Sequence, residues 1–578
     1  MSLNAISYSL PSDIEDAVRA ETERWTGEDK ISRVWSGDAA VWTGDDESKW
    51  LGWLDIVDAE LNNVDTYRRF AADIEQAQFK DVLLMGMGGS SLCPEVLAIT
   101  FGKKNFHILD STVPSQVKAI EDKLDLAKTL FIVASKSGST LEPNCFKQYF
   151  FDRVSQISDT PGKQFVAITD PGSKMEQIAK DDGFRQIFYG KPEIGGRFSA
   201  LSAFGLTAAA SMGLDVEILL QRSSEMVKAC KVGDAVSNPG ALLGVLLGIC
   251  HQKGKDKLTI FTSPDVHDVG AWLEQLIAES TGKRDIAIIP VDREPVLSPG
   301  FSRQPPDGGT QNAYGDDRVF VHLGLKGAAT DEATYGRLEE IERAGHPMIR
   351  IELESLYHLS QEFFRWEFAT AVAGSIMKIN PFNQPDVESA KIEAKKITEE
   401  YEQTGSLPDE TPFYQEEGIA LFSNESNALE LGVLAGENPS LAAFLGGHIS
   451  RLRAGDYFGL LAYIEMNPEN EKVLQSIREI VLNKAHAATC LGFGPRFLHS
   501  TGQAYKGGGN NGVFLQITSD DEVDLPVPGQ KYTFGVVKAA QARGDFQVLL
   551  DRGRRALRVH FHGNTADGLS KLHDLLSA

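Results

Sequence analysis

Glu279 is the side chain of this sequence best placed to move a proton, and Gln275 is its neighbour on the same helix. Residues 266–279 have a helical pattern of apolar side chains, and Gln275 precedes Glu279 by one turn, so both project from one helical face. A carboxylate between two neighbouring carbons can take a carbon-bound proton and return it to the next carbon, provided that positive charge stabilises the enediolate. This chemistry can move a carbonyl group from one carbon to the neighbouring carbon. The alternative is that Glu279, like Glu274, is an ordinary solvated helix charge.

Two polar loops offer a place for an anion. Residues 86–91 (Gly-Met-Gly-Gly-Ser-Ser) follow a β-rich run at 82–85, and residues 135–140 (Ser-Lys-Ser-Gly-Ser-Thr) follow another at 130–134. In an open parallel sheet, ligands bind beyond the carboxyl ends of the strands, where amides and helix N-termini point outward. The two loops together can therefore hold a phosphate dianion.

The glycine loop has other interpretations. A dinucleotide fingerprint needs a third small glycine where Ser91 stands, and a nucleotide P-loop needs a Gly-Lys-Ser/Thr that this loop lacks. Either loop alone is also compatible with a plain strand-to-helix turn. The occurrence of both loops, each after a strand of one sheet, favours the phosphate site.

The elements that position these residues predict an α/β fold. Runs at 82–85, 106–109, 130–134 and 165–169 alternate with helical patterns, and so do runs at 258–262, 286–291, 319–323 and 348–353. This alternation predicts two doubly wound parallel sheets, and runs at 458–465 and 513–518 indicate an additional C-terminal α+β domain. We expect an N-terminal helical segment at 1–79, α/β domains at 80–235 (phosphate loops) and 236–405 (Glu279), and the C-terminal domain at 406–578.

Composition excludes several partners. The 578 residues hold 57 Lys and Arg against 81 Asp and Glu, and the net charge of −24 repels nucleic acid and anionic lipid. The five cysteines are far apart and lack ligand-like spacing, so neither structural zinc nor a disulfide framework is expected. No apolar run suits a membrane helix and no leader pattern is present, which predicts a cytoplasmic protein. We expect no cofactor and no metal ion.

Three further motifs follow the two loops in the chain. They are residues 195–199 (Gly-Gly-Arg-Phe-Ser), 275–283 (Gln-Leu-Ile-Ala-Glu-Ser-Thr-Gly-Lys) and 380–391 (Asn-Pro-Phe-Asn-Gln-Pro-Asp-Val-Glu-Ser-Ala-Lys). With the loops, they resemble the sugar isomerase domain superfamily and, within it, the glucose-6-phosphate isomerases, which carry such motifs in the same order. The resemblance implies two sugar isomerase domains, a sugar phosphate as the ligand, and interconversion of an aldose 6-phosphate and its ketose, most directly glucose and fructose.

The resemblance also implies roles for individual residues. Glu279 is the proton-shuttling base, Arg197 stabilises the enediolate, and Lys391 assists the opening of the cyclic substrate. We expect Gln275 to contact the substrate. The phosphate contacts implied are Gly89, Ser90, Ser135, Lys136, Ser137, Thr140 and Gln384.

Each of these assignments has a structural alternative. Arg197 is also compatible with a helix-start charge or a structural ion pair. Lys391 is compatible with a charged helix face that Lys395 and Lys396 continue. The motif around Lys391 departs from the usual family pattern at Asn383, Asp386, Ser389 and Ala390.

The histidine that opens the sugar ring is not where the family usually carries it. The common form has a Gly-Gln-His segment shortly after the glutamate, and the sequence between 283 and 391 contains none. A glycine-rich segment at 494–509 holds His499, and this segment resembles the isomerase portion of transaldolase/glucose-6-phosphate isomerase fusion proteins. His499 is therefore the candidate, with His322, in a strand run, and His358, before a helix, as competitors.

Two other functions are compatible with the motifs. A sugar-phosphate sensor would keep the phosphate loops without needing a base, and a related isomerase would act on mannose or an amino-sugar phosphate. The resemblance implies a homodimer in which a neighbour supplies the histidine, whereas a C-terminal domain carrying His499 could complete the site in a monomer.

Overall fold

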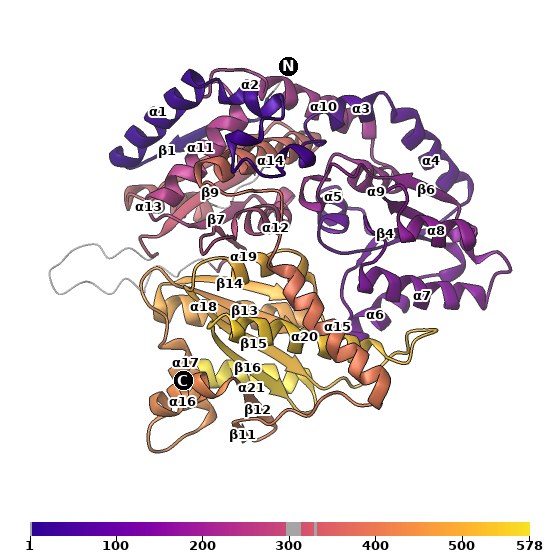
Figure 1. The fold of residues 1–578 in the computed structure, drawn as a ribbon, viewed down its shortest axis with the longest axis vertical. Helices are drawn as coiled ribbons and strands as arrows, with labels where there is room; N and C mark the ends of the chain where they lie inside the picture. Colours follow the sequence, from indigo (N-terminus) through magenta and orange to yellow (C-terminus); the bar gives the residue numbers. More distant parts are fainter. Residues whose placement is uncertain (1–2, 296–313, 329–331, 578) are drawn as a thin grey trace. The chain divides into compact units, whose positions relative to one another are not determined.

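Residues 3–295, 314–328 and 332–577 are described by the computed structural model of the chain (Figure 1). They form two compact units. Unit 1 combines Met1–Asp110, Ile120–Thr281 and Val319–Asn383, and unit 2 combines Ser111–Ala119, Gly282–Arg318 and Gln384–Ala578. The finer four-part division stays a prediction. No helix among the described residues has the length and apolarity needed to cross a bilayer.

The first sheet of unit 1 is parallel throughout, with the strand order β3-β2-β4-β5-β6 (Figure 1). Its strands are β2 (Asp81–Gly86), β3 (Phe106–Leu109), β4 (Thr129–Ala134), β5 (Phe165–Thr169) and β6 (Gln186–Tyr189). Its helices include α4 (Val64–Gln76), α5 (Leu92–Thr100), α7 (Leu141–Ser155), α8 (Lys174–Asp181) and α9 (Ala203–Ser211). The central strands β4 and β5 are buried along their whole length, as expected for a parallel sheet covered on both faces. The α/β prediction is confirmed, and β6 is a strand that the sequence pattern did not indicate.

The second sheet of unit 1 contains the strands in the order β1-β10-β9-β7. They are β1 (Ala5–Ser9), β7 (Lys257–Thr262), β9 (Arg318–Leu325) and β10 (Met348–Leu353). Strand β9 is parallel to β10, whereas β1 adds to β10 as an antiparallel edge strand. The N-terminal sequence indicated only helices, because β1 is short and mostly exposed and forms through pairing with a strand far away in the chain.

Unit 1 contains further helices. They are α1 (Ser12–Gly27), α2 (Lys30–Trp35), α3 (Ile56–Leu61), α10 (Val216–Ala229), α11 (Pro239–Gln252), α12 (Val269–Thr281), α13 (Glu332–Arg343) and α14 (Leu359–Ile376). Helix α12 follows β7 and ends just after Glu279, so it is the element that positions the predicted base. Trp272, Leu273, Leu276 and Ile277 are each at most 1% exposed, which anchors α12 in the core of unit 1.

Unit 2 is built around a third sheet with the order β11-β12-β16-β15-β13-β14. The strands β13 (Tyr457–Tyr463), β14 (Ala488–Phe493), β15 (Gly512–Ser519) and β16 (Arg555–Phe561) are parallel, and the antiparallel strands β11 (Tyr414–Glu416) and β12 (Ile419–Phe422) lie at one edge. The short strand β8 (Ile289–Asp292) also belongs to unit 2. Carboxyl ends of β15 and β16 therefore meet at one edge of this sheet, where ligands commonly bind.

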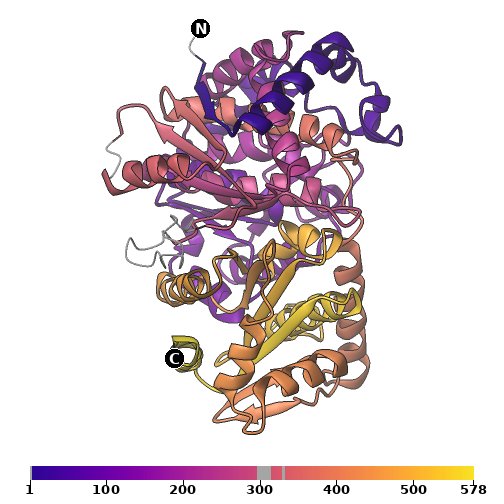
Figure 2. The same cartoon turned by 90° about the vertical axis from the view of Figure 1, so that its left-hand side faces the viewer.

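Helices flank both faces of the unit 2 sheet (Figures 1 and 2). Helices α16 (Glu425–Ala435), α17 (Leu441–Ile449), α18 (Pro468–Ala485) and α21 (Thr565–Ser577) share one hydrophobic core with the strands. Helix α20 (Phe534–Asp551) packs against α15 (Val387–Thr404), and the Gln516 side chain of β15 donates to the α20 carbonyl of Ala542 at 3.1 Å. Gln516 alternates with Leu515 and Ile517 of the apolar core, so the two faces of β15 serve different helices.

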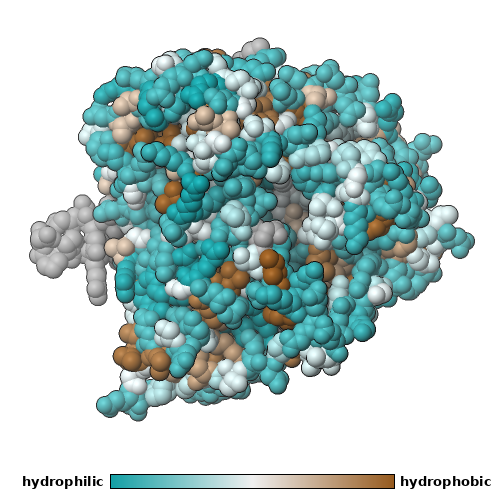
Figure 3. Space-filling model, viewed as in Figure 1, coloured by the Kyte–Doolittle hydropathy of each residue, from teal (hydrophilic) through white to brown (hydrophobic). Residues whose placement is uncertain are grey.

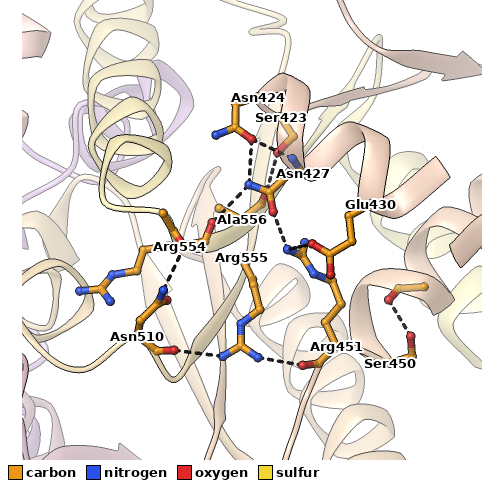
Figure 4. A network of polar contacts seen from close by, with 12 residues as sticks. Ser423, Asn424, Asn427, Glu430, Ser450, Arg451, Asn510, Arg554, Arg555 and Ala556 are labelled. Carbon is orange, nitrogen blue, oxygen red and sulfur yellow. Dashed lines mark hydrogen bonds and ion pairs between the residues drawn. The ribbon is translucent and has the colours of Figure 1, made fainter. Parts of the chain in front are cut away.

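A polar network fastens α16 and α17 to the start of β16 (Figure 4). The Arg451 guanidinium donates to the Asn427 side chain at 2.6 Å and to Glu430 at 2.8 Å, both on α16. Arg555, the first residue of β16, donates to the Arg451 carbonyl at 2.8 Å and forms two hydrogen bonds with Asp456, at 2.7 and 3.0 Å. This network holds the amino end of β16, opposite to the end at which ligands bind in such sheets.

The face seen in Figure 3 is mostly hydrophilic, in keeping with the acidic composition. A brown patch lies over the α16 region at the lower left of that view. On helix α16, Leu429 is 66% exposed, Val433 is 82% exposed and Leu434 is 45% exposed.

Candidate active site

The glycine loop leaves β2 and packs closely against a second turn of unit 1. Gly88–Ser90 form a 3-10 turn that leads into α5, and Gly88 has a φ of +55°. A Cβ added at Gly89 would lie 2.0 Å from the carbonyl oxygen of Gly196, so only glycine fits at this position. The glycine loop is thus held against the turn that carries Arg197.

Ser91 supports the glycine loop from inside the protein. Its hydroxyl lies 3.2 Å from the Gly88 carbonyl oxygen and 3.1 Å from a carboxylate oxygen of Asp110, and the residue is fully buried. A dinucleotide fingerprint has a glycine here so that the helix can pack closely against the strand. The contacts of Ser91 are instead internal braces of the loop.

The serine-rich loop leaves β4, which is the neighbour of β2. Gly86 and Ala134 are register partners, so the two loops begin side by side at one edge of the sheet. The hydroxyls of Ser137 and Ser139 lie 2.7 Å apart, and Thr140 stands directly before α7, whose first amides lack intrahelical partners. The structure therefore brings the two predicted loops together, and their binding of phosphate stays a prediction.

Lys136 and Ser135 occupy different environments in the serine-rich loop. The Lys136 ammonium forms an ion pair with Asp170, which follows β5, and lies 3.2 Å from the Pro192 carbonyl oxygen. Burial raises the pKa of Asp170 above its usual value, although Lys136 acts in the opposite direction. Ser135 is 3% exposed, and its hydroxyl has no hydrogen-bond partner within the part of the chain that the structure describes. An anion arriving at this loop would compete with Asp170 for the Lys136 ammonium.

A small cavity connects the two loops and adds polar groups that sequence reasoning missed. Its volume is about 10 Å³, and it is lined by Ser90, Lys136, Lys191, Ile194, Gly196, Ser199, Ser202 and Phe204. Lys191 brings a second ammonium to the cavity, within a chain whose net charge is −24. Lys191 lies in the loop after β6. The sequence pattern did not indicate that strand, so this loop was not predicted to contribute to the site.

Arg197 lies at the junction of the glycine loop and helix α12. It belongs to the 3-10 turn Gly196–Phe198 and is 2% exposed. Its guanidinium donates to the backbone carbonyl of Glu279 at 2.9 Å and lies 3.6 Å from a Glu279 carboxylate oxygen. It also donates to the carbonyls of Phe382 at 2.6 Å and Asn383 at 3.3 Å. Burial lowers the pKa of Arg197, and the Glu279 carboxylate partly offsets that effect.

This position suits an arginine for a second reason. The carbonyls of the last turn of a helix have no intrahelical partner, and Glu279 lies in the last turn of α12. A cation at that end also interacts favourably with the helix dipole. Arg197 therefore caps α12 and places positive charge beside the Glu279 carboxylate.

Gln275 and Glu279 meet on one face of α12, as the spacing predicted. Gln275 Nε2 donates to Glu279 Oε2 at 3.0 Å, and the two residues are 3% and 8% exposed. The other oxygen, Oε1, is the one that Arg197 approaches. One neighbour on each oxygen holds the carboxylate in a single orientation. The interpretation of Glu279 as a solvated helix charge is therefore wrong.

Gln384, Lys391 and His499 belong to unit 2. Gln384 and Lys391 are exposed, just before α15 and in its first two turns, and the motif at 380–391 is divided between the units after Asn383. His499 is half-buried at the end of the 3-10 turn Arg496–His499. The two polar loops, Arg197 and Glu279 therefore belong to unit 1. Gln384, Lys391 and His499 belong to unit 2.

The segment after His499 is tied to two other predicted motifs within unit 2. Helix α19 (Gly502–Gly507) contains Gln503, whose amide donates to the Gly282 carbonyl and to an Asp386 carboxylate oxygen, both at 2.7 Å. The Asp386 amide donates back to Gln503 at 3.0 Å. Lys506 of the same helix is fully buried in an ion pair with Asp545 at 2.5 Å. These polar side chains are structural, and they join the chain after Glu279 to the start of the Lys391 helix.

The competing histidines are buried within unit 1. His322 lies in β9, 6% exposed, and burial, with Arg350 adding to it, lowers its pKa to about 4. His358 is 6% exposed, and its Nδ1 lies 2.8 Å from the Ser355 hydroxyl. His322 is therefore a core residue of unit 1.

The chain is similar in sequence to known isomerases. Residues 70–291 match the sequence model of the family described as phosphoglucose isomerase. Over 59% of its length the chain is 28% identical to the glucose-6-phosphate isomerase of Methanocaldococcus jannaschii, of which it covers 88%. It is 26% identical, over 60% of its length, to the Campylobacter jejuni glucose-6-phosphate isomerase, of which it covers 92%.

Two solved structures share the fold. A hypothetical protein of Thermus thermophilus superposes with a TM-score of 0.56 at 22% identity, covering 68% of this chain and 99% of that one. A glucose-6-phosphate isomerase of Chlamydia trachomatis superposes with a TM-score of 0.54 at 17% identity, covering 70% of this chain and 89% of that one. The resemblance to the isomerase portion of transaldolase fusion proteins stays a prediction. From these sequence matches, residues 70–291 have the pattern of the phosphoglucose isomerase family, and the matches support aldose-ketose isomerase activity.

Proposed function

We propose that this enzyme interconverts glucose 6-phosphate and fructose 6-phosphate through a cis-enediol, with Glu279 as the base that carries the proton. The observation that carries the proposal is the fixed Glu279 carboxylate, with Gln275 3.0 Å from one oxygen and Arg197 3.6 Å from the other. Proton transfer to and from neighbouring carbons needs a carboxylate held in one place, because its oxygens must reach both carbons.

The reaction moves two protons, one from C2 to C1 and one from O2 to O1, and Glu279 carries the first. Glu279 takes the proton from C2 of open-chain glucose 6-phosphate, the C–H electrons form the C1–C2 double bond, and O1 gains the negative charge. Glu279 then returns the proton to C1, while the O2 hydroxyl loses its proton to O1 and becomes the new carbonyl. Arg197 lies close enough to Glu279 to stabilise the enediolate electrostatically. No metal ion or cofactor takes part in these steps.

The two loops support the phosphate end of the proposal. Ser90 of the glycine loop, Lys136 of the serine-rich loop and Lys191 line one small cavity, and the two loops leave neighbouring strands of the sheet. Such groups together favour a dianion. In this proposal Gly89, Ser90 and the serine-rich loop bind the phosphate, and Gln384 of unit 2 contributes a further contact.

Lys391 and His499 are proposed to assist ring opening of the cyclic substrate. Mixing a Glu279→Gln chain with a His499→Ala chain tests whether one subunit completes the site of another. Recovery of activity in the mixture indicates a shared site in a dimer, whereas additive residual activities indicate a site completed within one chain. His499→Ala is expected to slow cyclic substrate more than open-chain substrate, and equal effects would remove His499 from the mechanism.

The central experiment compares Glu279→Gln with the wild type in both directions, with chelator present. Because a positioned acid–base group contributes about 10²–10⁴-fold, kcat is expected to fall at least about a hundredfold. Glu274→Gln is the matched control on the same helix and is expected to retain activity. Solvent deuterium should no longer enter C1 or C2 of the substrate in Glu279→Gln. Full activity, or full deuterium exchange at C1 or C2, in that variant would contradict the proposed mechanism.

The substrate class is tested in the same assay. Preference for mannose 6-phosphate or an amino-sugar phosphate over glucose 6-phosphate would redirect the proposal to a related isomerase. Binding of sugar phosphates without turnover would indicate a sensor.

A further inference from the structure

Unit 2 contains a cavity that the isomerase proposal does not use. It has a volume of about 540 Å³ and lies at the carboxyl ends of β15 and β16. Its lining includes Thr518, Asp520, Lys538, His560 and His562, and none of the residues proposed for isomerisation. This volume is within the range of small-molecule sites, and the carboxyl ends of parallel strands are where such sites form.

Three metal-ligating side chains meet at this cavity. His560 lies in β16 and His562 directly follows the last residue of that strand, and the centroids of their rings are 4.7 Å apart. Asp520 directly follows β15, and the pairing of Thr518 with His560 brings it opposite the two histidines. One ligand atom from each of the three residues lies within 4.8 Å of the others.

The separations fit a small divalent ion. His560 Nε2 lies 3.0 Å from Asp520 Oδ1, and His562 Nδ1 lies 3.4 Å from Asp520 Oδ2. Zinc–nitrogen and zinc–oxygen bonds of about 2.0–2.2 Å in a tetrahedron place neighbouring ligand atoms roughly 3.3–3.5 Å apart. Small rotations of the exposed Asp520 and His562 side chains, 55% and 45% exposed, are therefore enough to surround an ion.

The surroundings of the three side chains favour metal binding over a plain ion pair. The Thr518 hydroxyl lies 2.9 Å from His560 Nδ1, and such an outer partner orients a ligand histidine and leaves Nε2 for the metal. Nearby cations are held by other carboxylates, since Lys538 pairs with Asp521. The Asp520 carboxylate contacts one imidazole with each oxygen.

We propose that Asp520, His560 and His562 form a binding site for a divalent transition-metal ion, with zinc the preferred occupant, at the mouth of this cavity. Two imidazoles and one carboxylate suit zinc and its neighbours among the transition metals and disfavour calcium and magnesium, which prefer oxygen ligands alone. Three protein ligands leave at least one coordination position for water or a small ligand, in contrast to a closed structural site.

The test is titration of the full chain, stripped with EDTA, with Zn²⁺ in a calorimeter, and with Co²⁺ in a spectrophotometer. The expected result is one saturable Zn²⁺ site per chain and a visible Co²⁺ band that Zn²⁺ abolishes. His562→Ala and Asp520→Asn should each weaken binding at least about tenfold, and Thr518→Val should weaken it by about 10–100-fold through the loss of the outer partner.

His573→Ala is the matched control. His573 also lies beside a carboxylate, with Nδ1 3.3 Å from Asp574 Oδ1, but it is not part of the three-residue cluster. Zn²⁺ affinity should be unchanged in this variant, and circular dichroism in EDTA checks that all variants are folded. Absence of a saturable site, or equal affinity in the wild type and His562→Ala, would overturn the proposal. Equal losses in His562→Ala and His573→Ala would also overturn it, because they would indicate dispersed surface binding.

Discussion

Replacement of Arg197 by methionine tests the coupling between the glycine loop and Glu279. The change keeps a long side chain but removes the charge that lies 3.6 Å from the Glu279 carboxylate and the donors to the Glu279, Phe382 and Asn383 carbonyls. Because Arg197 is 2% exposed, no water can replace these contacts without rearrangement. Removing one member of a buried ion pair typically destabilises a protein by about 3–5 kcal/mol.

The catalytic effect of Arg197→Met is expected to be of similar size. Losing one group that stabilises a developing oxyanion costs about 10²–10³-fold in kcat, or about 2.7–4 kcal/mol. KM should change much less, because the phosphate cavity is lined by other side chains. Arg197→Lys should recover part of the rate, since it restores charge but cannot donate in the geometry of a guanidinium to three carbonyls.

The assay measures initial rates over a range of fructose 6-phosphate concentrations, with thermal unfolding recorded on the same samples. Arg68→Met is the control in unit 1, because the Arg68 side chain is 54% exposed. A kcat within about threefold of the wild type, in a variant that is folded, would refute the proposed role of Arg197, since the expected loss is far larger. A raised KM with unchanged kcat would indicate instead that Arg197 binds the substrate and the transition state equally well.

Three other perturbations have defined expectations. Gly89→Ala should lower both stability and activity, because the new Cβ would lie 2.0 Å from the Gly196 carbonyl oxygen; wild-type values in a thermal melt and a rate assay would contradict the packing argument. Lys136→Ala and Lys191→Ala should each raise KM by about tenfold or more, with a smaller change in kcat. The reason is that a hydrogen bond to a charged group contributes about 1.5–3 kcal/mol. An unchanged KM would exclude that lysine from the phosphate site. Burial lowers the pKa of His448 to about 3, so the folded state favours the neutral imidazole. Neutral His448 therefore makes its full contribution to the free energy of unfolding above about pH 6.5. This contribution is lost by about 1.4 kcal/mol per pH unit as the pH falls from there towards 3. Urea unfolding from pH 7 to 4 should show a shallower loss of stability in His448→Gln, and identical pH slopes would contradict this assignment.

The local features of the site follow from local sequence. Gln275 and Glu279 are one helical turn apart, so a helix at this position places them on one face whatever the helix packs against. The two polar loops come after buried β-rich runs, and parallel strands direct such loops to one edge. The shared helix face and the shared sheet edge follow from the number of residues per helical turn and from the direction of parallel strands. Both are local properties, so the structure agrees with the prediction.

The partners of these side chains depend on contacts between distant segments. That Lys136 pairs with Asp170 depends on β4 lying beside β5, and Lys191 reaches the cavity only through β6, whose pattern is too short to stand out. The carbonyls that Arg197 caps are 82 to 186 residues away. No spacing within the sequence carries this information.

The sequence by itself determined the α/β class, the succession of strand, loop and helix, and which residue types could hold a phosphate and move a proton. Only the tertiary structure decided which group approaches each Glu279 oxygen, and it also brought Asp520 to His560 and His562 from a different strand. The physical reason is that backbone periodicity is a local property, whereas strand order, register and burial are set by the packing of the whole unit.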